Sequence, residues 1–192
     1  MFSAINVIDN FFKNPEQIVH LANDQQYYIF KDNPKYLRDE KKIFYNGRRT
    51  LFLKDILKKD VIENINGEIL KNLFELTIRK ESQIEISADI SCLFHSLFED
   101  DVYDVNNMHE DSVIFAGIVY LNKNLESNNH GTIIDGKVIS YKFNRLVFYR
   151  ADLLHCPLNG FGNDIKNSRL TLNIFVNKIK LSVKGTVIKN IQ

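Results

Sequence analysis

The sequence predicts an α+β fold in which helices come first and a sandwich or jelly-roll barrel of short strands follows. The first third of the chain places apolar residues at helical spacing. From about Gln83 the pattern changes to short strand-like segments, separated by turns rich in Asn, Asp and Gly. Helices followed by a run of strands are typical of this fold class. The 192 residues contain no internal repeat and no Pro/Gly-rich linker, so we expect one domain.

The N-terminal region is expected to contain a short strand and two helical segments. The strand is predicted at Ala4–Ile8, where apolar residues recur. Asn14 as the N-cap and Pro15 at the first helical position indicate the start of a helix. The span Leu51–Leu76 has apolar residues near helical spacing, and Gly67 is expected to mark a break or a weak point within it.

Six later segments have the composition of strands. They are Ile84–Phe94, Ser112–Leu121, Gly131–Ile134, Lys137–Phe143, Arg145–Arg150 and Ser168–Lys178. The second of them is apolar almost throughout, which suits a strand that is packed on both faces. In the last, polar and apolar residues alternate, so one face is expected to join the core while the other lines a polar cleft. The polar face carries Arg169, Thr171 and Asn173.

Charge and composition narrow the classes of partner. The formal net charge of +1 gives no general reason to expect a nucleic-acid or anionic-membrane partner. No stretch approaches the roughly 18 apolar residues that span a membrane, and the first residues lack the basic and apolar parts of a signal peptide. The two cysteines form neither a disulfide framework nor a zinc motif. We therefore expect a cytoplasmic protein, and the sequence leaves its oligomeric state open.

A local basic cluster is interrupted by acidic residues, and we interpret it as a solvated face rather than a phosphate-binding surface. Its members are Lys35, Arg38, Lys41, Lys42, Arg48 and Arg49. The segments expected to select a substrate are loops without a diagnostic motif. They are Asp24–Arg49, Glu99–Asn107 and Asn122–His130.

Three residues have the types and the order of a mononuclear iron site. His109 and Asp111 are separated by one residue, so both side chains point the same way in an extended segment. His155 follows several predicted strands later, a separation that can return the chain to the same mouth of a barrel. Two imidazoles and one carboxylate form the facial triad of non-haem Fe(II) oxygenases, which leaves metal positions open for an oxidant and a co-substrate.

Arg169 supplies a cation after the second of these histidines. A guanidinium that points into a barrel is costly unless a carboxylate neutralises it, and its planar fork suits a bidentate carboxylate. Thr171 lies on the same strand face and adds a hydroxyl group. Together the two residues suggest a dicarboxylate co-substrate.

With these residues in order, residues 83–178 resemble the 2-oxoglutarate/Fe(II)-dependent dioxygenase superfamily. The sequence looks closest to a poorly characterised, prolyl-hydroxylase-like branch of small stand-alone proteins. The matching segments are Met108–Ser112, Phe115–Leu121, Gly131-Thr132, Asn144–Tyr149, Leu153–His155 and Arg169–Thr171. The resemblance implies a double-stranded β-helix, a jelly-roll or cupin-like barrel, over residues 83–178. Residues 1–82 would form supporting N-terminal helices, and residues 179–192 a C-terminal tail.

The resemblance also implies roles for individual residues. The implied catalytic iron ligands are His109, Asp111 and His155. Arg169, helped by Thr171, would hold the distal carboxylate of 2-oxoglutarate. A phenol would add a hydrogen bond to the same co-substrate, and the sequence does not choose between Tyr103 and Tyr120 for this role.

The implied activity is that of an Fe(II)- and 2-oxoglutarate-dependent oxygenase that hydroxylates an unidentified substrate, a small molecule or a protein side chain, and releases succinate and CO2. Three alternatives stand beside it. Arg169 and Thr171 argue against a cupin-like metal enzyme that does not use 2-oxoglutarate. The complete ligand set argues against a non-catalytic jelly-roll module that binds a ligand or partner. A catalyst built from Cys156 and His155 is disfavoured because adjacent strand residues point to opposite faces.

Overall fold

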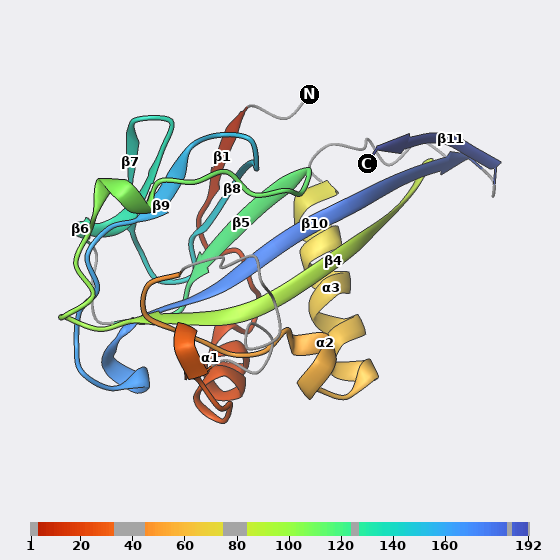
Figure 1. Cartoon of the computed structure of the whole chain (residues 1–192). Helices are drawn as coiled ribbons and strands as arrows, with labels where there is room; N and C mark the ends of the chain where they lie inside the picture. The colour runs from red at the N-terminus through yellow and green to blue at the C-terminus, as the bar shows by residue number, and fades with distance from the viewer. Residues whose placement is uncertain (1–3, 33–44, 75–83, 124–126, 184–185, 192) are drawn as a thin grey trace.

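The computed structural model describes residues 4–32, 45–74, 84–123, 127–183 and 186–191, and Figure 1 shows how their elements are arranged. The helices are α1 (Pro15–Asn23), α2 (Leu53–Ile56) and α3 (Lys59–Phe74), with single 3-10 turns at Phe30–Asp32, Val105–Asn107 and Ile165–Asn167. The strands are β1 (Ile5–Ile8), β2 (Tyr28–Ile29), β3 (Arg48–Arg49), β4 (Ile84–Leu97), β5 (Phe115–Tyr120), β6 (Ser127–Ile134), β7 (Lys137–Tyr141), β8 (Leu146–Arg150), β9 (His155–Pro157), β10 (Arg169–Val183) and β11 (Thr186–Ile191).

Two antiparallel sheets organise the described residues. The larger sheet has the order β1-β8-β5-β10-β4-β3-β2, and β11 pairs with the far part of β10. The smaller sheet has the order β7-β6-β9. In Figure 1 the long strands β4 and β10 run side by side across the molecule, and the smaller sheet lies beyond one end of this pair. This mostly antiparallel architecture with few helices is the one that the sequence pattern predicts.

Each face of the larger sheet is covered by a different core. The helix-facing core includes Ile18, Leu53, Ile69 and Leu73 from the helices, together with Val119, Leu170, Leu172 and Ile174 from β5 and β10. The core on the opposite face includes Ala116, Ile118 and Tyr120 of β5, together with Ile134 and Tyr141 of the smaller sheet. Because alternate residues of β5 enter different cores, the strand is buried on both faces as its continuous apolar sequence predicts.

The helical predictions are correct in place and partly wrong in detail. Helix α1 begins at Pro15 as expected, and Asp24 follows its last residue. The second helical span is divided, but the break is at Leu57, whose backbone is extended, and not at Gly67. Gly67 is exposed within α3, a Cβ atom at this position would meet no neighbouring atom within 4 Å, and the helix continues through it. The predicted end at Leu76 lies outside the described residues.

The strand predictions miss the shortest elements. Strands β2, β3 and β9 have two or three residues, too few to produce a recognisable period. Strand β10 extends beyond Lys178 to Val183, and the predicted tail pairs with it as β11. The end of the predicted loop Asn122–His130 belongs to β6, which includes His130. Among the described helices none is long and apolar enough to cross a membrane.

Asn144 joins the N-terminal segment to the larger sheet. Its backbone has a positive φ of 56°, and its side chain is buried. The amide oxygen accepts a hydrogen bond from the backbone N–H of Phe12 at 2.9 Å, and the amide nitrogen donates to the Phe12 carbonyl at 2.9 Å. Asn is one of the few residues that tolerate a left-handed conformation, so this position needs both its backbone and its side-chain properties.

We expect Asn144→Ala to lower the free energy of unfolding by about 4 kcal/mol, because two buried backbone groups lose their partners and alanine is strained at this φ. Asn10→Ala is the matched control, since Asn10 also has a positive φ, 55°, but is exposed. It should cost about 1 kcal/mol. Urea unfolding of both variants measures the difference. Equal losses of unfolding free energy would contradict the role of the two hydrogen bonds between Asn144 and Phe12.

Candidate active site

A short backbone bridge brings the two histidines of the predicted triad together. The N–H of His109 donates to the carbonyl of His155 at 3.1 Å, and the N–H of His155 donates to the carbonyl of His109 at 2.9 Å. Their ring centroids are 4.5 Å apart. The N–H of Asp111 donates to the Ala151 carbonyl at 2.9 Å, which extends the pairing. The segment that contains the HxD pair therefore runs beside the segment that enters β9.

The three side chains converge as the sequence predicts. His155 Nε2 lies 3.3 Å from Asp111 Oδ2, and His109 Nε2 lies 4.0 Å from Asp111 Oδ1. One ligand atom from each residue lies within 4.8 Å of the others, the one such group of three found among the described residues. Ligands at right angles and about 2.1 Å from one ion are roughly 3 Å apart, so small side-chain adjustments would close this site around a metal.

Backbone carbonyls fix which nitrogen of each histidine faces the site. His109 Nδ1 lies 2.8 Å from the Asn107 carbonyl, and His155 Nδ1 lies 2.8 Å from the Leu153 carbonyl. A carbonyl only accepts hydrogen bonds, so each Nδ1 carries a proton in these contacts and each Nε2 keeps its lone pair for a metal. The sequence gives no sign of these partners, because they are main-chain atoms.

The protonation states also suit metal binding. Burial lowers the pKa of His109, which favours its neutral form. Burial alone would raise the pKa of Asp111, but its neighbours His155, His109 and Arg49 outweigh this effect and lower the pKa. A neutral imidazole and an ionised carboxylate are the forms that bind metals.

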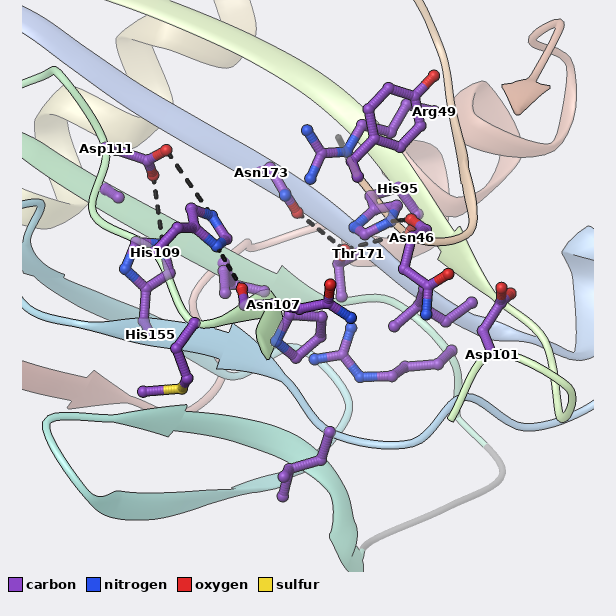
Figure 2. Close-up of a pocket in the computed structure, with 18 of the residues that line it drawn as sticks. Asn46, Arg49, His95, Asp101, Asn107, His109, Asp111, His155, Thr171 and Asn173 are labelled. Atoms are coloured by element: carbon purple, nitrogen blue, oxygen red, sulfur yellow. Dashed lines mark hydrogen bonds and ion pairs between the residues drawn. The ribbon is translucent and has the colours of Figure 1, made fainter. Parts of the chain in front are cut away.

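The triad faces a cavity of about 530 Å³. Figure 2 shows it with side chains that enter from several strands. Arg49, His95, Thr171 and Tyr120 form one row of paired positions across β3, β4, β10 and β5. Directly paired residues point to the same face of a sheet. Three members of this row line the cavity, and they are Arg49, His95 and Thr171.

Arg169 is a buried cation on the cavity wall, with only 1% of its surface exposed. Its Nε donates to the His130 carbonyl at 2.6 Å, and its Nη2 donates to the Gly131 carbonyl at 2.8 Å and to the Thr132 hydroxyl at 3.1 Å. No carboxylate of the described residues forms an ion pair with it. Because a guanidinium stays charged even when burial lowers its pKa, this site presents an uncompensated positive charge to the cavity.

The remaining predicted residues take different positions. Thr171 lines the cavity, and its hydroxyl contacts the His95 carbonyl at 3.2 Å and Asn173 Oδ1 at 2.9 Å. Tyr120 is fully buried, with its hydroxyl 2.8 Å from Thr132 Oγ1 and its ring centroid 5.5 Å from the guanidinium carbon of Arg169. Tyr103 is 37% exposed and lines a separate, open pocket. Tyr120 is thus the tyrosine beside Arg169, and a role for either phenol in binding stays a prediction.

Sequence reasoning missed two residues of the cavity wall. The interpretation of the basic cluster as a solvated face is wrong for Arg49, which lines the cavity. Lys35, Arg38, Lys41 and Lys42 lie outside the described residues. His95, which had no recognisable partner in the sequence, is buried on the same wall with Nε2 2.7 Å from the Asn46 carbonyl. Burial, followed by the charge of Arg49, holds the pKa of His95 well below its usual value, so this residue is neutral.

The structure also separates Cys156 from His155. The Cys156 thiol lies against the Met108 sulfur at 3.2 Å, and burial raises its pKa to about 11. A thiol in this state is a poor nucleophile. Since His155 instead contacts Asp111, the two neighbours do not form a catalytic pair, as the alternation along a strand predicts.

Comparisons with known proteins give one matching family model and several solved structures of similar fold. A sequence model described as "Family of unknown function (DUF6445)" matches residues 135–176, which include His155, Arg169 and Thr171. No curated protein matches the sequence. An oxidoreductase of the 2OG-Fe(II) oxygenase family from Burkholderia pseudomallei is similar in structure, with a TM-score of 0.62 and 12% identity, over 91% of this chain and 84% of that chain.

Two further solved structures share the fold. A prolyl-4-hydroxylase from Pseudomonas putida has a TM-score of 0.53 and 13% identity, over 91% of this chain and 92% of that chain. HygX from Streptomyces hygroscopicus, solved with nickel and 2-oxoglutarate bound, has a TM-score of 0.51 and 8% identity, over 90% of this chain and 83% of that chain. The protein therefore shares its overall fold with 2-oxoglutarate/Fe(II) oxygenases, including a prolyl hydroxylase, as the resemblance in sequence predicts.

We expect Asp111→Asn to weaken Mn(II) binding by more than about 100-fold, because it removes the anionic ligand and even changes in the partners of ligands cost 10–100-fold in affinity. Glu110→Gln is the matched control, since Glu110 is the neighbouring residue, is exposed and is not part of the triad. Isothermal titration calorimetry with Mn(II) measures both variants. Wild-type affinity in Asp111→Asn would overturn the ligand set.

Proposed function

We propose that this protein is an Fe(II)- and 2-oxoglutarate-dependent oxygenase with a double-stranded β-helix, which hydroxylates a substrate and releases succinate and CO2. One observation carries the proposal: a His-Asp-His triad and a buried guanidinium without a carboxylate partner line the same cavity. A triad of this type leaves metal positions open and is characteristic of non-haem iron. The guanidinium supplies the matching charge for a second carboxylate.

In this proposal each residue has a distinct task. His109, Asp111 and His155 would hold the iron, and their positions are fixed by the backbone bridge and by the carbonyls at both Nδ1 atoms. Iron with 2-oxoglutarate supplies the oxidising chemistry when both are bound. Arg169 and Thr171 would orient the co-substrate through its distal carboxylate. Tyr120 would help to position Arg169, because the Tyr120 hydroxyl is hydrogen-bonded to the Thr132 hydroxyl, which also accepts a hydrogen bond from Arg169.

The alternatives explain less of the site. A cupin-like metal enzyme without 2-oxoglutarate would bury Arg169 in a cavity with no carboxylate to neutralise it, at a considerable cost in free energy. A non-catalytic binding module has no need for two histidines whose Nδ1 atoms are bound to backbone carbonyls and whose Nε2 atoms both face the carboxylate of Asp111. The cytoplasmic location and a small molecule or protein side chain as substrate belong to this proposal as expectations from the sequence.

An anaerobic titration with Fe(II) tests the proposal by the weak visible charge-transfer band of an iron chelate. We expect a band with 2-oxoglutarate, and a need for about 100-fold more 2-oxobutanoate, which lacks the distal carboxylate. Charge-assisted hydrogen bonds contribute about 1.5–3 kcal/mol, and about 2.7 kcal/mol corresponds to 100-fold in affinity. Arg169→Gln should remove the difference between the two acids and leave Mn(II) binding in place.

Two further variants keep this test decisive. Arg150→Gln is the control for loss of a cation, because Arg150 pairs with Asp152 on the surface. Thr171→Val removes the hydroxyl without touching the buried guanidinium, and it should weaken 2-oxoglutarate to a lesser degree if Arg169→Gln does not fold. A folded, metal-binding wild-type protein without the band would rule out the co-substrate and favour the cupin-like alternative.

A further inference from the structure

His95 presents a hydrogen-bond acceptor to the cavity. Its Nε2 lies 2.7 Å from the Asn46 carbonyl. Because a carbonyl only accepts hydrogen bonds and the imidazole is neutral, Nε2 carries the proton and Nδ1 carries a lone pair. Among the described residues Nδ1 has no hydrogen-bond partner, and it is not one of their solvent-inaccessible atoms that lack one. Since His95 is only 4% exposed and lines the cavity, a ligand reaches this nitrogen from the cavity.

The neighbours of His95 hold its ring in this orientation. The Tyr45 ring packs against it edge-on, with the ring centroids 6.5 Å apart. Gly47 follows Asn46 with a positive φ of 73°, and a Cβ atom there would lie 2.5 Å from the Ser96 carbonyl oxygen. Glycine therefore lets the Asn46 carbonyl approach the imidazole. An acceptor that is fixed before a ligand binds loses little freedom on binding.

His95 lies away from the proposed co-substrate site. In the sheet order β8-β5-β10-β4, the strand β10 separates His95 on β4 from β5. The Arg169 guanidinium lies beside Tyr120 of β5, and the His155 ring packs against Tyr149 of β8 with centroids 4.8 Å apart. Figure 2 likewise shows the triad at one side of the cavity and His95 at the other. A co-substrate between the triad and Arg169 thus leaves the His95 side to a second molecule.

The lone pair of His95 selects a neutral donor group. It accepts a hydrogen bond only from an O–H or N–H group, so an ionised carboxylate has no favourable contact with it. Asp104 and Glu110 also line the cavity, but the charges that act most on the pKa of His95 are those of Arg49 and Arg169. Because these charges are positive, they would repel an ammonium group at this nitrogen.

We propose that His95 is a substrate-anchoring residue, and that its Nδ1 accepts a hydrogen bond from a neutral O–H or N–H group of the substrate. Tyr45 and Leu97 line the same cavity, so this group would be attached to an apolar body. The assignment rests on the proposed function, which puts metal and 2-oxoglutarate on the other side. Strands β4 and β8 are three spacings of about 4.8 Å apart, so His95 would hold a part of the substrate that is remote from the oxidised carbon.

The protonation of the His95 ring can be measured on the unmodified protein. A long-range 1H–15N correlation spectrum distinguishes a protonated ring nitrogen from one with a lone pair, and the His95 signals are assigned by their loss in His95→Gln. The protein is saturated with 2-oxoglutarate and with Zn(II), a diamagnetic substitute for iron. We expect a protonated Nε2 and an unprotonated Nδ1, and the Nδ1 signal should move upfield when a donor binds.

Two pairs of probes, which differ only in a donor, test recognition. Pentan-1-ol and 1-fluoropentane test an O–H group, and pentanamide and hexan-2-one test an N–H group. Backbone amide shifts give the dissociation constants. We expect the donor of at least one pair to bind about tenfold more tightly than its partner, which is the effect of about 1.4 kcal/mol from one hydrogen bond. The pair that shows the preference identifies the donor as O–H or N–H.

Two substitutions separate ligand binding from structural support. In His95→Gln the amide nitrogen is as many bonds from Cβ as Nε2, so it can still donate to Asn46, but the acceptor at the Nδ1 position is lost. His95→Asn keeps an acceptor at that position and loses the bond to Asn46. We expect Gln to abolish the preference and Asn to retain part of it, whereas a purely structural role predicts the reverse. His20→Gln, at an exposed histidine of α1, is the control with wild-type preference.

Other results have definite meanings. A protonated Nδ1, no preference in either pair, or a preference that persists in His95→Gln would overturn the proposal. If His95→Gln does not fold, His95→Asn supplies the assignment, and an Nδ1 shift in wild type with the donor but not with its partner decides the question. An Fe(II)–2-oxoglutarate band without a donor preference leaves the oxygenase function standing and removes the role of His95. A preference that depends on His95, without the band, has the opposite meaning.

Discussion

The site depends on the two hydrogen bonds that pair the backbones of His109 and His155. This bridge places the HxD segment beside β9 and brings the triad into one cluster. Strand β9 also pairs with β6, through Ile134 with His155 and Thr132 with Pro157. Since β6 supplies the carbonyls that accept hydrogen bonds from Arg169, the short strand β9 connects the triad to the cation. The relative positions of the two halves of the site are therefore fixed by main-chain pairing.

The surroundings of Arg169 also include an unusually close approach of the β6 and β7 backbones. A Cβ atom at Gly131 would overlap the carbonyl oxygen of Ile139 on the neighbouring strand, so only glycine allows β6 and β7 to approach here. Beside this close approach, the carbonyls of residues 130 and 131 accept hydrogen bonds from Arg169. Burying a guanidinium costs free energy that neutral carbonyls offset only in part. The part of this free-energy cost that is not offset favours the binding of an anion beside Arg169. Binding sites commonly gain affinity in this way at the expense of stability.

The sequence predicts the parts of the site that depend on periodicity or order. The alternation from Arg169 to Ile174 shows which face of β10 meets the core, and the order of His109, Asp111 and His155 shows the triad. Other parts leave no pattern. The partners of both Nδ1 atoms and of Arg169 are carbonyls, which every residue has. Arg49 lies on a strand of two residues, and nothing in a sequence of adjacent arginines shows that only one of them faces the cavity.

The residues that line the cavity differ in how firmly the sheet fixes them. The triad and Arg169 lie where strands have partners on both sides or are joined by a backbone bridge, so their geometry is determined by the core. Arg49 lies on β3, between β4 and the two-residue strand β2, at the edge of the larger sheet. Residues at such an edge can change without disturbing the central strands. The cavity therefore combines side chains whose positions are fixed by the central strands with one side chain, that of Arg49, which an edge strand supplies.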